Sequence, residues 1–144
     1  MLNFYKLHSD PNQLNGYKDA HLKIPEIAWE VADTNEKKQE LEHLWIHDPR
    51  YAYEYAYDIV RGKWSPGEKV ITSDPRYAYE YAYYVIKKPW EPGEKAISSD
   101  PAYAYMYACY VLRKPWPSGE KAIASDPDWK QEYENHFKLN FSNA

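Results

Sequence analysis

Hydrophobic and polar positions repeat along this chain with a fixed period of 26 residues. Three consecutive segments, Asp48 to Ser73, Asp74 to Ser99 and Asp100 to Ser125, align without a gap, and the first two are identical at 17 of 26 positions. Each segment opens with Asp-Pro, continues through alternating tyrosines and alanines, and closes on Gly-Glu-Lys-x-Ile. Such similarity between neighbouring segments indicates a tandem-repeat protein.

The first half of each repeat predicts an amphipathic helix of about 14 residues. Asp48 suits the N-cap and Pro49 the first helical position. In the first repeat the apolar positions follow the spacing of one helix face: Tyr51, Ala52, Tyr55, Ala56, Ile59 and Val60. The alternation of tyrosine with alanine would also suit a strand. A degenerate copy, in which residues 25–32 align with residues 49–56, keeps the apolar spacing of a helix instead.

The second half of each repeat predicts a short helix. The first helix should end near Arg61 and Gly62, or near Lys88 and Pro89 in the next repeat, because glycine and proline terminate helices. A tryptophan follows at one fixed position, and Pro-Gly-Glu or Ser-Gly-Glu then opens a segment of about seven helical residues.

These units predict an all-α fold, a short α-solenoid of helix–turn–short-helix repeats in a single domain, 1–144. Residues 1–23 form an N-terminal cap and residues 24–47 a degenerate repeat in this interpretation. The repeats 48–73, 74–99 and 100–125 follow, and residues 126–144 form a partial repeat and C-terminal cap.

The pattern resembles the Asp-Pro-x-Tyr-Ala-Tyr-x-Tyr-Ala repeats of many small proteins from tailed bacteriophages and some bacteria. The resemblance covers roughly Ile24 to Trp129 and includes the Gly-Glu-Lys-x-Ile segments at Gly67, Gly93 and Gly119. It implies a phage origin but carries no information about an activity. Through the phage origin it implies a partner that is a bacterial host protein, for example a defence protein that the phage protein inhibits.

Composition narrows the class of partner and the compartment. The net charge is -4, which does not favour non-specific binding to nucleic acid or to anionic membranes. The start of the chain has no apolar run typical of a signal peptide, and no stretch has the length of a membrane helix. We therefore expect no membrane association and a cytoplasmic protein, in the host cytoplasm if the chain is phage-encoded.

The tyrosine stripes are the first candidate binding surface. The chain contains 16 Tyr and 6 Trp, more aromatic rings than one helix face can bury. Tyrosine offers rigid contact area with a polar tip, which favours protein interfaces. The candidate partner-binding residues in these stripes are Tyr53, Tyr57, Tyr79, Tyr83, Tyr84, Tyr105 and Tyr110. Stacking of each ring on its counterpart one repeat along is the alternative for Tyr53, Tyr79 and Tyr105.

The third repeat departs from the other two in a way that suggests an anchor point. Ala102 and Met106 replace an arginine and a glutamate of the earlier repeats, and Cys109 replaces a tyrosine. An exposed apolar patch often marks a partner site, so we expect the strongest contacts around these residues and Tyr110. Random drift is the alternative.

A ladder of basic residues is the second candidate surface: Arg61, Lys63, Lys87, Lys88, Arg113 and Lys114. Interleaved with tyrosines, these cations could hold a phosphate backbone while bases stack on the rings. The simpler interpretation is that they complement the negative end of the helix dipole. Aspartates also recur, but helix capping explains them better than mimicry of nucleic acid.

Candidate chemistry is sparse. His43 and His47 have the i, i+4 spacing of a shared metal, but the sequence offers no third ligand, so we predict no metal and no cofactor. Cys109 is a lone thiol without an evident base. No phosphate-loop, dinucleotide or hydrolase motif occurs. We therefore expect a binding protein and not an enzyme.

The leading hypothesis is a scaffold that binds a protein partner along its tyrosine-rich flank. Nucleic-acid or nucleotide binding through the tyrosine, lysine and arginine ladder is the alternative, and a purely structural repeat is a third. The sequence is compatible with a monomer or a closed homodimer.

Overall fold

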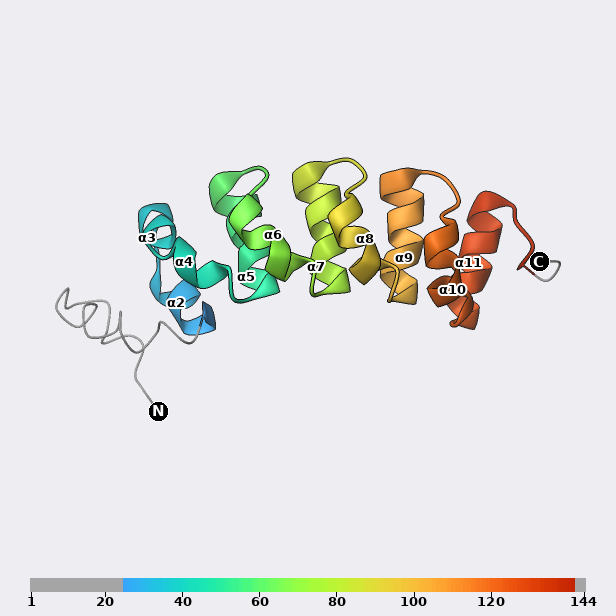
Figure 1. Ribbon diagram of the computed structural model, residues 1–144, viewed down its shortest axis with the longest axis horizontal. Helices are drawn as coiled ribbons and strands as arrows, with labels where there is room; N and C mark the ends of the chain where they lie inside the picture. The colour runs from blue at the N-terminus through green and yellow to red at the C-terminus, as the bar shows by residue number, and fades with distance from the viewer. Residues whose placement is uncertain (1–24, 142–144) are drawn as a thin grey trace.

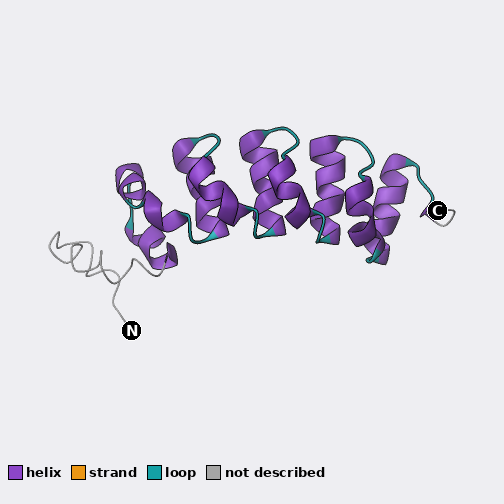
Figure 2. Cartoon of the chain, in the orientation of Figure 1, coloured by secondary structure: helices purple, strands orange, loops and turns teal. Residues whose placement is uncertain are grey.

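The computed structural model describes residues 25–141, and helices are its only regular structure in that range, with no strand (Figure 2). The helices stand side by side in one row from the N-terminal to the C-terminal end (Figure 1). The first helix of each central repeat packs on the first helix of the next, as α5 does on α7 and α7 on α9. The predicted all-α solenoid is confirmed. No helix between residues 25 and 141 is both long and apolar enough to cross a membrane.

The three central repeats share one arrangement of elements. Their first helices are α5 (Pro49–Glu54), α7 (Pro75–Glu80) and α9 (Pro101–Met106), which continue as the π-helices η2 (Tyr55–Val60), η3 (Tyr81–Ile86) and η4 (Tyr107–Leu112). Their second helices are α6 (Ser65–Ile71), α8 (Glu91–Ile97) and α10 (Pro117–Ala124). The element order thus recurs with the 26-residue period of the sequence.

The Asp-Pro pairs start the first helices as the sequence predicts. The Asp48 carboxylate accepts hydrogen bonds from the backbone N–H groups of Arg50, at 2.9 Å, and Tyr51, at 3.2 Å. The same pair of bonds forms at Asp74, Asp100 and Asp126. Each aspartate therefore satisfies two of the free N–H groups at a helix start.

The second half of each first helix differs from the continuous α-helix that the pattern predicts. It is a π-helix, in which each N–H reaches back five residues instead of four; the Lys87 N–H donates to the Ala82 carbonyl at 2.8 Å. The helices then end on Arg61, Lys87 and Arg113, at φ of 56°, 59° and 56°. The left-handed residue at each of these helix ends is thus a lysine or an arginine. In the first repeat it is Arg61 and not the following Gly62, and no glycine within residues 25–141 has a positive φ.

The fixed tryptophans hold the short second helices against the first ones. The Trp64 ring is buried and packs on Gly67 of α6. A Cβ at Gly67 would lie 2.4 Å from Trp64 Cε3, and at Gly93 the distance to Trp90 Cε3 would be the same. Glycine is required at these positions because the ring occupies the place of a side chain.

Neighbouring repeats are joined by a buried hydrogen-bonded link. The Tyr81 hydroxyl accepts from the Trp64 backbone N–H at 2.9 Å and donates to the Glu68 carboxylate at 2.9 Å. Tyrosine thus comes from one repeat, while tryptophan and glutamate come from the repeat before it. The same hydroxyl link occurs at Tyr107 and Tyr133, and the Tyr55 hydroxyl donates to Glu42 at 3.2 Å.

The two ends of the row vary the repeat. The degenerate copy consists of α2 (Pro25–Val31), α3 (Asn35–Glu40) and α4 (Glu42–Trp45), and at its end Trp45 fills the place that Ile71 fills in the next repeat. The last helix, α11 (Pro127–Phe137), is an α-helix throughout. The N-terminal cap predicted for residues 1–23 lies outside the described residues, as do residues 142–144 at the C-terminal end.

Candidate functional site

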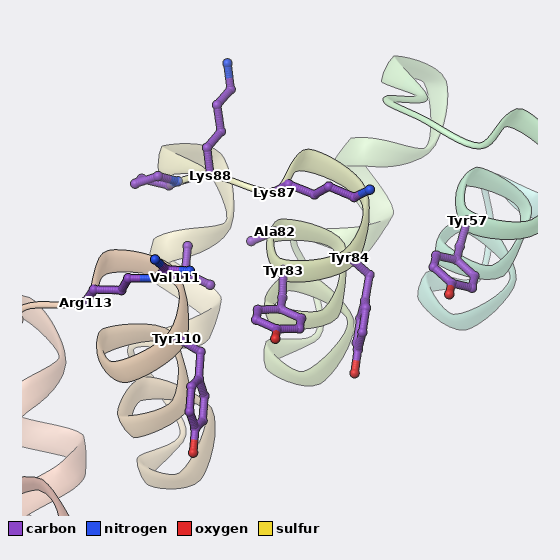
Figure 3. Close-up of a pocket in the computed structure, with 10 residues that line it drawn as sticks. Tyr57, Ala82, Tyr83, Tyr84, Lys87, Lys88, Tyr110, Val111 and Arg113 are labelled. Carbon is purple, nitrogen blue, oxygen red and sulfur yellow. The ribbon is translucent and has the colours of Figure 1, made fainter. Parts of the chain in front are cut away.

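Four large rings stand out on the surface of the row. Tyr57, Tyr83, Tyr84 and Tyr110 are 47%, 40%, 45% and 48% exposed, although the other tyrosines of the repeats are buried or half-buried. All four line one groove of about 670 Å³ that crosses the three central repeats. We call it the tyrosine groove. Lys87, Lys88 and Arg113 also line it, and so do Ala82 and Val111 (Figure 3). Pro89 completes the lining.

The rings of the groove support one another. Tyr57 stacks on buried Tyr53 with ring centroids 5.9 Å apart, and Tyr83 stacks on buried Tyr79 at the same distance. Tyr84 stands edge-on to Tyr83 at 4.8 Å. It also stands edge-on to Tyr57, at 5.9 Å. These contacts order the rings of Tyr57, Tyr83 and Tyr84, which form an aromatic wall of the groove.

The hydroxyl groups of the four tyrosines point in one common direction, away from the cations at the other end of the groove (Figure 3). Among residues 25–141, none of these hydroxyls forms a hydrogen bond within the protein. They contrast with the buried hydroxyls of Tyr81 and Tyr107, which each bind two groups. The groove therefore offers unused donors and acceptors next to an apolar wall.

The predicted basic ladder divides between the groove and other places. Lys87, Lys88 and Arg113 are exposed groove residues. Arg61 lines an adjoining hollow of about 430 Å³ that shares Tyr57, Tyr84 and Lys87 with the groove. Lys63 instead lies 3.9 Å from Glu68, and Lys114 lines neither hollow. The ladder is thus shorter than the sequence suggests.

Two stripe tyrosines prove to be packing residues. Tyr53 and Tyr79 are 9% and 8% exposed, so the interpretation of these two as partner contacts is wrong. Tyr53 lies 5.9 Å from Tyr77 of the next repeat, and Tyr79 lies 5.9 Å from Tyr103. Each ring therefore packs on the tyrosine that lies two residues before its counterpart in the next repeat, and not on the counterpart itself. Burial raises the pKa of both hydroxyls.

Tyr105 ends the same stripe, half-buried at 5.3 Å from Trp129 of α11. Burial raises the pKa of its hydroxyl to about 12. Its packing partner is a residue of the C-terminal unit, so it too joins one unit to the next. Tyr105 does not line the groove.

The residues of the third repeat that we predicted as the strongest partner contacts do not lie together on one surface. Cys109 is buried, which removes it from any contact surface, and burial raises the pKa of its thiol to about 11. A thiol with that pKa stays protonated at neutral pH and is a poor nucleophile. Met106 is half-buried against the core, and neither it nor Ala102 lines the groove. Only Tyr110 of this group is a groove residue.

The Ala102 and Met106 substitutions have a simpler explanation in the structure. In the earlier repeats the matching residues form ion pairs, Arg50 with Glu54 and Arg76 with Glu80, both at 2.8 Å. The third repeat replaces both members of that pair together. An exposed i, i+4 ion pair contributes about 0.3–0.5 kcal/mol, so its loss is tolerated.

The histidine pair has no common helix. The helix α4 ends at Trp45, so His47 lies in the turn beyond it, and the interpretation that places both histidines on one helix is wrong. Within residues 25–141, no group of three or more His, Cys, Asp or Glu side chains could hold a metal ion.

Sequence reasoning did not identify Ala82, Pro89 and Val111 as groove residues. Pro89 was recognised only as a helix terminator, while Ala82 and Val111 are the counterparts of Ala56 and Ile59, which the pattern assigned to the apolar helix face. The floor of the groove lies between two repeats, so no single repeat pattern reveals it. Comparison with protein-family models, with curated proteins and with solved structures found no match. The resemblance to the phage repeats therefore stays a prediction.

Proposed function

We propose that this protein is a non-enzymatic repeat scaffold that binds a protein partner through the tyrosine groove. The observation that supports this proposal most is the gathering of four exposed tyrosines on one face, one from the first repeat, two from the second and one from the third. Interfaces favour tyrosine because it gives large contact area at little cost in conformational entropy. Packing already orders most of these rings, which reduces that cost further.

The resemblance of the repeats to those of phage proteins supports a bacterial host protein as the partner, with inhibition of a host defence protein as the outcome of binding. In that setting the protein acts in the host cytoplasm. The solenoid supplies the geometry, because a row of repeats offers an extended face to its partner.

The test is capture from bacterial lysate by the immobilised full chain, with quantification of the retained proteins. A Tyr84→Ala/Tyr110→Ala variant removes two groove rings, and a Val60→Ala variant removes an exposed apolar side chain that lies outside the groove lining. Circular dichroism confirms that both variants remain helical.

We expect one protein to be retained by the wild type and by Val60→Ala. With that protein purified, its affinity should fall at least about ten-fold for Tyr84→Ala/Tyr110→Ala, because central aromatic residues dominate interface energies. Equal retention by all three proteins would show that the groove is not the binding site.

A further inference from the structure

The tyrosine groove carries a charge opposite to that of the whole chain. Its lining includes three cations, Lys87, Lys88 and Arg113, and no aspartate or glutamate. The chain as a whole has a net charge of -4. Cations concentrated in a hollow of an acidic protein create a local positive potential, which attracts anionic groups and repels cationic ones.

These cations are not used within the protein. Among residues 25–141, Lys87, Lys88 and Arg113 form no ion pair within 4.0 Å, whereas Lys63 pairs with Glu68 outside the groove. Lys87 and Arg113 also sit in the left-handed conformation at the ends of their helices, but Lys138 does so outside the groove. The helix dipole alone can therefore place a cation there, and the inference rests on the composition of the groove.

The position of the charges favours the second and third repeats. In the first repeat, Asp58 occupies the place that Tyr84 and Tyr110 occupy in the next two, and it lines the adjoining hollow beside Arg61. An anion near Asp58 would be repelled. The part of the groove between Tyr84 and Tyr110 has no such opposing carboxylate.

The ring geometry distinguishes a peptide from single-stranded nucleic acid. Bases bind to aromatic platforms by stacking on open ring faces. A stacked neighbour covers one face of the Tyr57 ring and one face of the Tyr83 ring, and Tyr84 meets these rings at 72° and 90°, so the ring contacts reduce the open face that bases could stack on. Hydroxyl groups without partners suit the N–H and C=O groups of a polypeptide.

We infer that the groove between the second and third repeats binds an acidic segment of the partner protein, with carboxylates next to Lys87 and Arg113 and the polypeptide backbone beside the tyrosine hydroxyls. This inference rests on the proposed function and specifies the chemistry of its partner.

The test uses an array of random peptides and the labelled full chain. One variant, Lys87→Asn/Arg113→Asn, removes two groove cations and keeps a residue that tolerates the left-handed backbone. Its control, Lys95→Gln/Lys121→Gln, removes two exposed cations on the second helices and has the same net charge. Tyr84→Ala/Tyr110→Ala reports on the groove itself, and labelled oligothymidylate is the nucleic-acid probe.

We expect the bound peptides to be enriched in Asp and Glu. For the best of them, affinity should fall about three- to thirty-fold with Lys87→Asn/Arg113→Asn, as two partly screened charge pairs imply, and should be unchanged in the lysine control. Replacing its carboxylates with amides should cause a similar loss.

Other outcomes separate this inference from the proposed function. Peptides without acidic enrichment that bind wild type and Lys87→Asn/Arg113→Asn alike, but not Tyr84→Ala/Tyr110→Ala, would overturn the acidic segment and leave the groove as the protein-binding site. Peptides that bind Tyr84→Ala/Tyr110→Ala as well as wild type would overturn both. Tighter binding of oligothymidylate than of any peptide, or no bound peptide, would also overturn the inference.

Discussion

The buried links between repeats and the exposed groove follow different rules, although both are built from tyrosines of the same helices. The buried link keeps its chemistry from one end of the row to the other, with Tyr55, Tyr81, Tyr107 and Tyr133 each donating to a glutamate of the preceding unit. The groove positions change from repeat to repeat: where the second repeat has Tyr84, the first has Asp58.

This difference separates the positions that define the fold from the surface positions that can vary from repeat to repeat. A buried hydroxyl that bonds a backbone N–H and a carboxylate cannot be replaced without leaving a polar group unpaired. A ring at the surface carries no such constraint. Changes at the buried links should therefore alter the free energy of unfolding strongly, and changes at the exposed positions should alter it weakly.

The largest expected effect is unfolding at high pH. Burial raises the pKa of the Tyr81 and Tyr107 hydroxyls above the ordinary value of 10.0. Above pH 10 the unfolded chain therefore loses these protons while the folded chain keeps them. Their stabilising contribution is complete below pH 10 and falls by about 1.4 kcal/mol per pH unit per tyrosine above it. Denaturant titrations from pH 8 to 12 measure this, and a flat profile would contradict it.

The next effect tests the close approach of tryptophan and glycine. A methyl group at Gly93 would lie 2.4 Å from Trp90 Cε3, whereas at Gly62 it would meet nothing within 4 Å. Gly93→Ala should lower the free energy of unfolding by about 3 kcal/mol, at the upper end of the range for overpacked cores. Gly62→Ala should leave it equal or slightly higher. Urea titration of both variants decides, and equal stabilities would count against the packing.

A smaller loss should separate a buried hydroxyl from an exposed one. Tyr107→Phe removes the acceptor of the Trp90 N–H and the donor to Glu94, so we expect a loss of about 1–2 kcal/mol. Tyr110→Phe removes a hydroxyl without a partner among the described residues, and its effect should stay within about 0.5 kcal/mol. Thermal unfolding followed by circular dichroism compares the two; similar melting temperatures would refute the difference.

The smallest effect concerns the exposed ion pairs. Arg76→Ala/Glu80→Met gives the second repeat the residues of the third, and it removes a pair at 2.8 Å on the surface. The free energy of unfolding should change by no more than about 0.5 kcal/mol. The double substitution removes one positive and one negative charge, so the net charge stays the same. A loss several times larger would mean that the pair supports the packing of neighbouring repeats.

Much of the fold could be predicted from the sequence because its signals are local and repeated. The Asp-Pro starts, the helix spacing and the fixed tryptophans each act within a few residues of one another. The π-helices could not be predicted, because the apolar spacing of Tyr55 to Val60 is compatible with an α-helix as well as with a π-helix. The sequence predicted where the first helices end, but it did not reveal that their left-handed end residues are the cations Arg61, Lys87 and Arg113.

The candidate site was predicted less completely. Its four exposed tyrosines were among the expected contacts, but Tyr53 and Tyr79 are buried by rings of the following repeat. Whether a ring at the edge of a helix face is covered depends on the angle between successive repeats. That angle comes from packing between units, which a pattern within one unit does not contain.

The tyrosine link has a consequence for how such a protein can change in length. Each unit offers a hydroxyl to the unit before it and a tryptophan N–H and a glutamate to the unit after it, as Tyr81 and Trp90 do on either side of the second repeat. The two sides of a unit are complementary, and the link between units always runs in the same direction along the chain. Duplication of one 26-residue unit would therefore insert into the row with every bond satisfied, and it would extend the face available to a partner in equal steps.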